Sequence, residues 1–215
     1  MYPVLFKLWK LPVYSWGLSL AVAFIVGTLY GVFAGKKKGV HPDHVIDLAL
    51  FVCIASIIAG RLLFVLLNLG SYMSDPITIL YLRDGGLSFF GGLAGGILVG
   101  IWYCRRNKIS VGKMADIAGP AVALGYAIVR IGCLLNGCCY GVESSVPWAL
   151  ECGTGMVLRH PTQIYAAIYS LIIFAILMYA DRKKKFDGQV LFLYVGLYSV
   201  ARFIVEFWRD VPRDY

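Results

Sequence analysis

The sequence predicts an all-α protein, a polytopic bundle of membrane-spanning helices, and three observations lead to this fold class. Of its 215 residues, 60% are hydrophobic and only 15% are charged, whereas a soluble domain has about 25% charged residues. The mean hydropathy is +0.75. Apolar runs long enough to cross a bilayer, about 20 residues each, recur along the whole chain. A soluble globular enzyme, a disordered chain and a small disulfide-rich domain are therefore excluded.

Six apolar runs mark the expected transmembrane helices, so the bundle has six helices, with seven as the alternative. The runs cover residues 17–34, 45–68, 86–104, 117–136, 163–180 and 190–208. The sequence contains no internal repeat and no long linker between these runs. We therefore expect a single transmembrane domain over residues 1–215.

The basic residues are concentrated in three of the connections between the runs. Segments 36–38, 105–113 and 182–185 hold more than half of the 20 lysines and arginines. Cytoplasmic loops of membrane proteins carry such an excess, so these three loops are predicted to be cytoplasmic and segments 69–85 and 137–161 to face outward. The net charge of +8 then reflects membrane topology, and we expect no nucleic-acid partner.

Four charged residues stand out inside the apolar runs: Arg61, Arg130, Arg202 and Glu206. A charge at bilayer depth costs roughly 2.5–3.5 kcal/mol on insertion scales, so each one marks a candidate functional site. Arg130 and Arg202 each lie six residues before the outer end of their run, a depth of about 9 Å, and Arg61 lies at a similar depth. Guanidinium groups at this level suit the phosphate of a lipid headgroup.

The last apolar run places its polar residues on one helical face. Tyr194, Tyr198, Arg202 and Glu206 recur every fourth residue, so they are neighbours along the helix surface. Such a face is expected to point into the bundle or into a wet cavity. In the alternative interpretation, Arg202 simply pairs with Glu206 and the other arginines extend to the headgroups.

Glycines dominate the start of the third run. Gly92, Gly96 and Gly100 are spaced by four, a pattern that lets two helices approach closely. The doublet Gly85-Gly86 does not fit that pattern, and it suggests backbone brought close to a ligand.

Four of the six cysteines lie at or after the end of the fourth run: Cys133, Cys138, Cys139 and Cys152. A disulfide from Cys138 or Cys139 to Cys152 suits an oxidising outer space, and neutral packing or a nucleophilic thiol are the other interpretations. Because the spacing contains no CxxC pair, the sequence does not favour a zinc site, and no metal is expected.

Four blocks of residues, taken in order, resemble a known family. They are Gly85-Gly86-Leu87-Ser88-Phe89-Phe90-Gly91-Gly92-Leu93, Val129-Arg130-Ile131-Gly132 leading to Asn136-Gly137 and Gly141, Arg159-His160-Pro161-Thr162-Gln163-Ile164-Tyr165, and Ala201-Arg202-Phe203-Ile204-Val205-Glu206-Phe207-Trp208-Arg209. Gly60-Arg61-Leu62 adds weaker support. The chain resembles the prolipoprotein diacylglyceryl transferases of bacterial membranes.

The resemblance implies an enzyme of lipoprotein biosynthesis in the bacterial cytoplasmic (inner) membrane. Members of the family transfer the diacylglyceryl group of phosphatidylglycerol to the lipobox cysteine thiol of a preprolipoprotein and release glycerol phosphate. The implied partners are phosphatidylglycerol, the preprolipoprotein signal peptide and membrane lipids. No metal and no soluble cofactor is implied.

The resemblance also assigns roles to residues. The two essential arginines of the family fall on Arg130 and Arg202, its tyrosine and glutamate of the last helix on Tyr198 and Glu206, and its signature-ending glycine on Gly141. His160 is the outward-facing imidazole available for proton transfer. Substrate binding is assigned to the remaining candidates, which are Arg61, Gly85, Gly86, Ser88, Asn136, Gly141 and Gln163.

One departure from the family pattern bears on the chemistry. Where the family usually reads Ser-Phe-His-Gly-Gly, this chain has Phe90 in place of the histidine, and phenylalanine neither accepts a proton nor donates a hydrogen bond. Three alternatives follow: a relative that acts on another acceptor, a phospholipid-binding or transport protein without chemistry, and a scaffold in which the buried arginines are structural.

Overall fold

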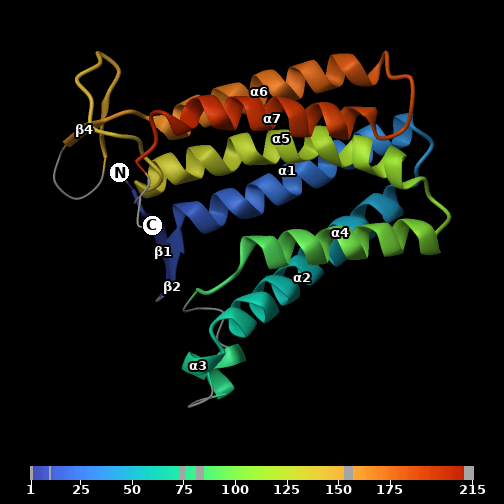
Figure 1. Cartoon of the computed structure of the whole chain (residues 1–215), viewed down its shortest axis with the longest axis horizontal. Coiled ribbons are helices and arrows are strands. Elements are labelled where there is room, and N and C mark those ends of the chain that lie inside the picture. The colour runs from blue at the N-terminus through green and yellow to red at the C-terminus, as the bar shows by residue number, and fades with distance from the viewer. Residues whose placement is uncertain (1, 10, 73–75, 81–84, 153–156, 211–215) are drawn as a thin grey trace. The chain divides into compact units, whose positions relative to one another are not determined.

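The computed structural model describes the chain except residues 1, 10, 73–75, 81–84, 153–156 and 211–215 (Figure 1). Six helices dominate it: α1 (Ser15–Lys37), α2 (Pro42–Leu67), α4 (Phe89–Arg106), α5 (Val111–Asn136), α6 (Thr162–Asp181) and α7 (Gln189–Glu206). The shorter elements are β1 (Val4–Leu8), β2 (Leu11–Tyr14), α3 (Leu69–Tyr72), η1 (Pro76–Leu80), β3 (Leu150–Cys152) and β4 (Val157–Arg159). The all-α class is confirmed.

Every predicted apolar run coincides with one of the six long helices. Five of these helices (α1, α2, α5, α6 and α7) are long and apolar enough to cross a membrane. The sixth, α4, has 18 residues and is less apolar because it contains several glycines and ends in Arg105 and Arg106. Among the described residues, no further helix has the length of a seventh span.

The start of α4 differs from the prediction. Residues 86–88 were expected to be helical, but α4 begins at Phe89, and Ser88 is its N-cap, accepting a hydrogen bond from the Gly91 amide at 3.5 Å. Gly85 and Gly86 precede the cap with φ angles of +83° and +82°. Glycine adopts this left-handed conformation at little cost, which explains the doublet in part. Asp84 lies outside the described residues.

The chain divides into two compact units, which are described separately. One consists of Met1–Gly31 with Ala115–Tyr215, and the other is Val32–Met114. The expected single domain over residues 1–215 stays a prediction.

In the first unit, α5 packs against α1, α6 and α7, which lie beside it in Figure 1. Small residues allow the close approach to α1: a side-chain carbon on Gly132 would lie 2.4 Å from Cβ of Ser19. The core is formed by Ala123, Ile173, Leu177 and Val190. A membrane helix lacks the hydrophobic drive toward its neighbours, so this close fit is what holds the bundle together.

A buried carboxylate fixes α7 at its start. Asp116 of α5 is 1% exposed, and its oxygens accept hydrogen bonds from the backbone amides of Gly188, Val190 and Leu191 at 2.9, 2.9 and 3.2 Å. Lys184 forms an ion pair with the same carboxylate at 2.8 Å. Asp116 thus satisfies the free amides of the α7 N-terminus and complements its positive dipole end.

In the second unit, α2 and α4 pack along a row of glycines. A side-chain carbon on Gly91 would lie 2.6 Å from the Ala59 carbonyl oxygen, and one on Gly95 would lie 2.4 Å from the Ala59 Cβ. For the predicted residues, a carbon on Gly92 would lie 3.2 Å from the Ser56 carbonyl oxygen and one on Gly96 would lie 2.7 Å from the Ser56 Oγ, so the predicted close packing is confirmed at these two positions. Gly100 contributes little to it, because a carbon there would meet Val52 at an ordinary 3.8 Å.

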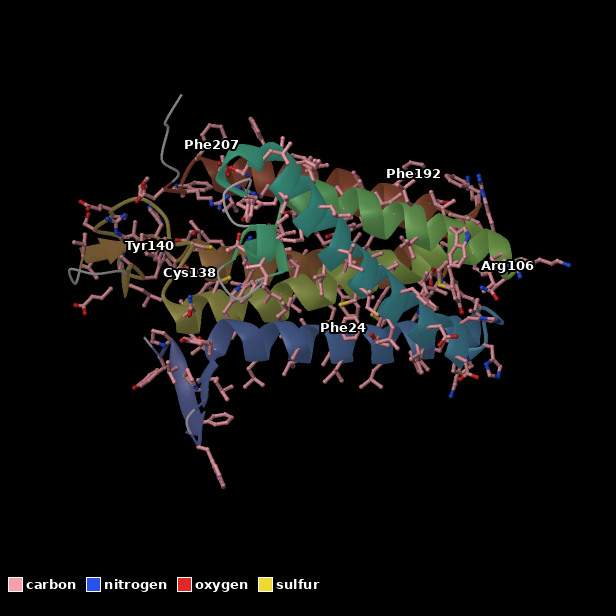
Figure 2. All side chains as sticks on the ribbon, turned by 90° about the horizontal axis from the view of Figure 1, so that it is seen from below. Phe24, Arg106, Cys138, Tyr140, Phe192 and Phe207 are labelled. Carbon is pink, nitrogen blue, oxygen red and sulfur yellow. The ribbon has the colours of Figure 1, made fainter. Side chains whose placement is uncertain are left out.

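Large apolar side chains cover the outside of the helices. Figure 2 shows Phe24, Phe192 and Phe207 projecting outward, and Phe192 and Phe207 are each 71% exposed. The β1–β2 hairpin carries further apolar residues, among them Trp9, which is 97% exposed. This exterior suits lipid, and the chain is a multi-pass membrane protein.

Candidate active site

Arg130 lies on the face of α5 that points toward α6 and α7, and its guanidinium is only partly satisfied. Its Nη2 donates a hydrogen bond to the hydroxyl of Tyr126 at 2.5 Å, and the guanidinium carbon lies 4.6 Å from the centroid of the same ring. Its Nε is buried and has no hydrogen-bond partner among the described residues. A buried donor left unpaired costs about 1–3 kcal/mol, more when the group is charged, so its place here requires a reason.

Arg202 and Arg209 supply two further guanidinium groups from the end of α7. Glu206 holds both: it forms an ion pair with Arg202 one turn before it, and its carboxylate lies 3.8 Å from Nη1 of Arg209. The predicted pairing of Arg202 with Glu206 is confirmed. The carboxylate accepts a hydrogen bond from Nη1 of Arg202 alone, and its contact with Arg209 is an ion pair without a hydrogen bond. Each guanidinium therefore keeps further N–H groups for the pocket that both residues line.

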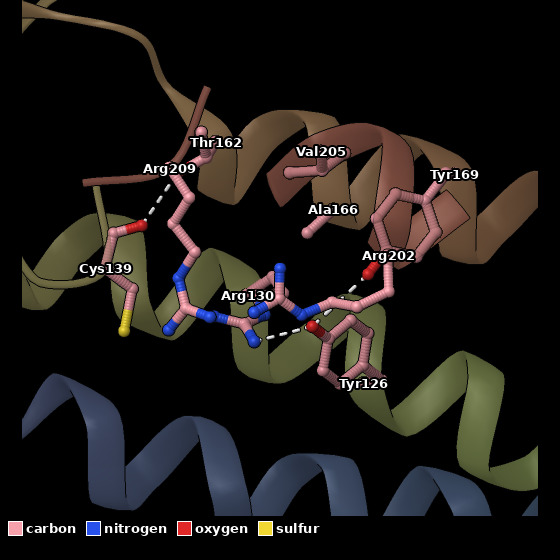
Figure 3. A pocket seen from close by; sticks show the side chains of 9 residues that line it. All are labelled: Tyr126, Arg130, Cys139, Thr162, Ala166, Tyr169, Arg202, Val205 and Arg209. Carbon is pink, nitrogen blue, oxygen red and sulfur yellow. Dashed lines mark hydrogen bonds between the residues drawn. The ribbon is translucent and has the colours of Figure 1, made fainter. Parts of the chain in front are cut away.

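These three arginines line one narrow pocket. Its wall comprises Tyr126, Arg130, Cys139, Thr162, Ala166, Tyr169, Arg202, Val205 and Arg209. Figure 3 shows the guanidinium groups of Arg130, Arg202 and Arg209 gathered at its centre, with the ring of Tyr126 below them and that of Tyr169 beside Arg202. Three cationic forks around one space form a site for a phosphate or another small anion.

Tyrosines close the inner end of this pocket. Tyr169 donates a hydrogen bond to the Tyr126 hydroxyl at 3.3 Å. The ring of Tyr198 lies 5.6 Å from that of Tyr126 and 6.3 Å from that of Tyr169, centroid to centroid. Tyr198 therefore packs behind the pocket, and it is not one of the residues that line it. Tyr126, which accepts a hydrogen bond from Arg130, and Tyr169 are the two tyrosines that line the pocket.

Gly141 joins the loop after α5 to the end of α7. Its amide donates to the His160 carbonyl at 2.9 Å, and the next amide, of Val142, donates to the Trp208 carbonyl at 3.0 Å. A side-chain carbon on Gly141 would lie 2.1 Å from that Trp208 oxygen, so only glycine fits. The signature glycine thus keeps Arg209, which follows Trp208, beside the pocket.

The first residues of α6 hold the loop from the other side. Thr162 donates from Oγ1 to the Cys139 carbonyl at 2.8 Å, and Gln163 donates from Nε2 to the Cys138 carbonyl at 2.8 Å. Gln163 is 1% exposed, and its Oε1 is buried without a partner among the described residues. Its contacts position the loop; its expected role in substrate binding stays a prediction.

His160 and Asn136 lie near the pocket but do not line it. The Nδ1 of His160 is 3.0 Å from the Tyr165 hydroxyl, and Trp148 donates to the same hydroxyl at 2.7 Å. Asn136 is the last residue of α5. Proton transfer by His160 stays a prediction, and its ring is engaged with Tyr165 in this structure.

Arg61 belongs to the second unit and is surrounded by backbone oxygens. Its guanidinium donates to the carbonyls of Thr78, Ile79, Gly85 and Gly86 at 2.8–3.0 Å, and the residue is 7% exposed. The ligand brought close to the glycine doublet is thus Arg61 itself. These contacts, together with Ser88 as the α4 N-cap, organise the segment before α4, and a role in substrate binding stays a prediction for all of these residues.

The cysteines at the end of α5 are free thiols in the structure. This applies to Cys133, Cys138 and Cys139, so the disulfide considered from Cys138 or Cys139 is absent; the side chain of Cys152 lies outside the description. The pKa of the Cys139 thiol is lowered from 9.0 to about 5, chiefly because Cys133 donates a hydrogen bond to it, with help from Cys138, Arg130 and Arg209.

The sequence analysis missed several residues that line the pocket. Tyr126 stands one helical turn before Arg130, a spacing that marks it as a neighbour on the same face of α5. Arg209 likewise follows Glu206 by three residues. Tyr169 and Thr162 carry no such signal, because their approach depends on how α6 packs against α5.

The fold and the pocket together define a class: a multi-pass helical membrane protein with a partly buried cluster of arginines suited to an anionic headgroup. Residues 3–213 match the sequence profile of the family described as prolipoprotein diacylglyceryl transferase. The chain belongs to the prolipoprotein diacylglyceryl transferase family, whose members are transferases.

Relatives match over nearly the whole chain. The phosphatidylglycerol–prolipoprotein diacylglyceryl transferase of Clostridium tetani is 34% identical over 218 residues, covering 99% of this chain and 87% of the relative. The enzyme of the same name from Geobacter sulfurreducens is 36% identical, with 97% and 82% covered. That of Clostridioides difficile is 34% identical, with 94% and 81% covered.

Proposed function

We propose that this chain transfers the diacylglyceryl group of phosphatidylglycerol to the lipobox cysteine of a preprolipoprotein, at the outer face of the bacterial cytoplasmic membrane. The observation that carries the proposal is the pocket in which Arg130, with its buried unpaired Nε, meets Arg202 and Arg209. The names of the relatives identify the two substrates, phosphatidylglycerol and a prolipoprotein. The charge asymmetry of the sequence supports a cytoplasmic position for the basic loops.

In this mechanism the arginines bind the phosphate of the donor lipid. Their N–H groups stabilise the charge that develops on the phosphate oxygen as the bond to glycerol C3 breaks. Stabilisation of such developing charge is usually the largest single contribution to the rate enhancement of an enzyme. Glu206 positions Arg202 and Arg209 through its ion pairs. The incoming thiolate forms the new S–C bond, and glycerol phosphate leaves with the electron pair of the broken C–O bond.

An apolar groove beside the pocket suits the acyl chains of the donor. It lies between α6 and α7, has a volume of about 500 Å³, and is lined by Ile172, Phe192 and Val200 among others. Tyr169 borders both the groove and the arginine pocket. A headgroup among the arginines and a hydrocarbon tail in the groove are the two parts of one phospholipid.

Phe90 favours one alternative, a phospholipid-binding protein that performs no transfer. Its side chain is 74% exposed within its unit and supplies no acid or base. Direct measurement separates the two functions. Purified protein is incubated with phosphatidylglycerol labelled in its diacylglycerol part and a lipobox peptide, and the controls are a cysteine-to-alanine peptide and the Arg202→Ala enzyme.

Thiol-dependent label in the peptide that is lost in both controls supports the transferase. Lipid binding that depends on Arg202, with no label in the peptide, overturns it in favour of the binding protein. If a different thiol peptide is labelled and the lipobox peptide is not, the enzyme acts on another acceptor.

A further inference from the structure

Three cysteine thiols meet at the end of α5. Cys133 lies in the last turns of the helix, and Cys138 and Cys139 follow it in the loop. The Sγ atoms of all three lie within 4.8 Å of one another. Figure 2 marks Cys138 at this end of the bundle, and Figure 3 shows Cys139 at the edge of the arginine pocket.

The turn that ends α5 brings these thiols together, although their spacing in the sequence contains no CxxC pair. Gly137 adopts a left-handed φ of +73°. Its amide donates to the Leu134 carbonyl at 3.2 Å, and the Cys138 amide donates to the Cys133 carbonyl at 3.1 Å. This pair of bonds is a Schellman turn, which folds the chain back over the last helical turn. The reversal places two cysteines of the loop over one of the helix.

The backbone of the two loop cysteines is held in place by α6. Thr162 and Gln163, which are 3% and 1% exposed, bind the carbonyls of Cys139 and Cys138 through the hydrogen bonds described above. Cys139 also has a positive φ of 63°, a strained conformation for a residue other than glycine that persists only when its surroundings enforce it. The backbone that carries these two thiols is therefore fixed by the surrounding structure.

We propose that Cys133, Cys138 and Cys139 bind one Zn²⁺ through their thiolates and leave its fourth coordination position open. Zinc prefers tetrahedral sites with Zn–S distances of about 2.3 Å, which place sulfurs about 3.8 Å apart, so the observed cluster needs to contract by only about 1 Å. Three protein ligands with an open position are typical of catalytic rather than structural zinc sites.

The charge of the site suits its neighbours. Three thiolates around one Zn²⁺ have a net charge of −1, and Arg130 and Arg209 line the same pocket as Cys139. Their guanidinium groups complement a negative centre, whereas an isolated cation beside them would be repelled. The arginines therefore favour the loaded tris-thiolate site.

The open position gives the zinc a role in the reaction, and this step rests on the function proposed above. The acceptor cysteine binds the zinc as a thiolate, and its thiol proton passes to solvent. The bound sulfur then attacks glycerol C3, the S–C bond forms as the C–O bond to phosphate breaks, and glycerol phosphate departs with that electron pair. The thioether product is a weak ligand and leaves the metal. Zinc in this way provides a thiolate at neutral pH without a histidine base.

Cobalt binding tests the site without relying on activity. Full-length protein in detergent is reduced, stripped with a chelator and titrated with Co²⁺, and the thiolate-to-cobalt charge-transfer and tetrahedral ligand-field bands are recorded. We expect about one equivalent to bind, bands typical of three sulfur ligands, and competition by Zn²⁺. A small thiol-containing peptide is expected to intensify the charge-transfer band by adding a fourth sulfur.

Serine variants locate the metal. Cys133→Ser, Cys138→Ser and Cys139→Ser are expected to lose the tris-thiolate spectrum, whereas Cys53→Ser, a free cysteine of α2, keeps it. X-ray absorption of the zinc-loaded native protein is expected to give Zn–S distances of about 2.3 Å. If a variant does not fold, the Zn–S distances and the number of sulfur ligands measured on the native protein decide whether the site exists.

The two proposals fail in different ways. Reduced native protein that binds neither Co²⁺ nor Zn²⁺ yet labels the lipobox peptide overturns the zinc site and leaves the transferase standing. Three-sulfur metal binding without transfer to any thiol peptide supports the site and overturns the proposed reaction. Spectra that do not respond to an added thiol overturn the catalytic use of the open position.

Discussion

Arg61 and Arg130 look alike in the sequence and differ in what surrounds them. Both are single arginines inside apolar runs, at a similar depth. Arg61 donates four hydrogen bonds to backbone carbonyls. Arg130 donates a hydrogen bond to the Tyr126 hydroxyl, and its Nε is buried without a partner among the described residues.

The difference teaches how to interpret a charge inside a membrane helix. Each such charge costs free energy, and the cost is offset either by the protein itself or by a ligand. At Arg61 the protein supplies the acceptors, so the residue stabilises its own unit. At Arg130 the acceptors are incomplete, and two more guanidinium groups share its pocket. The count of satisfied donors, rather than depth, separates a structural arginine from a binding one.

The sharpest test of this contrast is Arg130→Gln. We expect transfer of labelled diacylglycerol to the lipobox peptide to fall by about 10²–10³-fold, the usual cost of removing one donor from a charge-stabilising site. Thermal unfolding in detergent is expected to occur at the native temperature or higher, because a partly unpaired buried charge is removed. Native activity, or a clear loss of stability, contradicts a binding role for Arg130.

Arg61→Gln is expected to show the opposite pattern. Up to four backbone carbonyls lose their donor, and a buried group left unpaired costs about 1–3 kcal/mol, so we expect a loss of about 3 kcal/mol or more in unfolding free energy. Denaturant titration in micelles measures it, with Arg130→Gln as the matched control. If Arg61→Gln unfolds like the native protein, the carbonyl cage is not what stabilises the second unit.

Gly141→Ala probes the contact that holds Arg209 at the pocket. The added carbon would overlap the Trp208 carbonyl, so we expect a loss of about 2 kcal/mol in unfolding free energy and a reduced rate of transfer. Gly17→Ala, at a helical glycine with nothing within 4 Å of the added carbon, is the control and is expected to be neutral or slightly stabilising. If the two variants have the same unfolding free energy and the same transfer rate, the close contact with Trp208 is not the reason for glycine at position 141.

Phe90→Leu is expected to have the smallest effect. The side chain is 74% exposed in its unit, and exposed substitutions usually change stability by no more than about 0.5 kcal/mol. If the reaction needs no acid or base at this position, the transfer rate stays near the native value. A large loss of transfer with unchanged folding shows that the aromatic ring contacts substrate, and that the chemistry is not confined to the arginine pocket.

The helices were predictable because the period and length of apolar runs are local properties. The expected run 117–136 falls within α5, and 163–180 falls within α6. The pairing of Arg202 with Glu206 was equally predictable, since the two are one turn apart. Asp116, just before the fourth run, was overlooked because it carries no pattern of its own.

What escaped prediction depends on packing between segments distant in the sequence. Tyr169 reaches the pocket only because α6 lies against α5, and it contacts Tyr126, 43 residues earlier. The cage around Arg61 is made of main-chain oxygens, which any sequence could provide. The thiol cluster depends on a turn at Gly137, so spacing rules written for metal sites on other turns did not indicate it.

Segment 143–159 begins and ends at a pair of backbone hydrogen bonds between its flanking residues. The amide of His160 donates to the Val142 carbonyl at 3.1 Å, and Gly141 donates back to the His160 carbonyl at 2.9 Å. Doubling the length of a loop closed in this way costs only about 0.6 kcal/mol. We therefore expect the segment to tolerate a change of length, so that an epitope or a fluorophore placed in it leaves the paired residues at its ends in position.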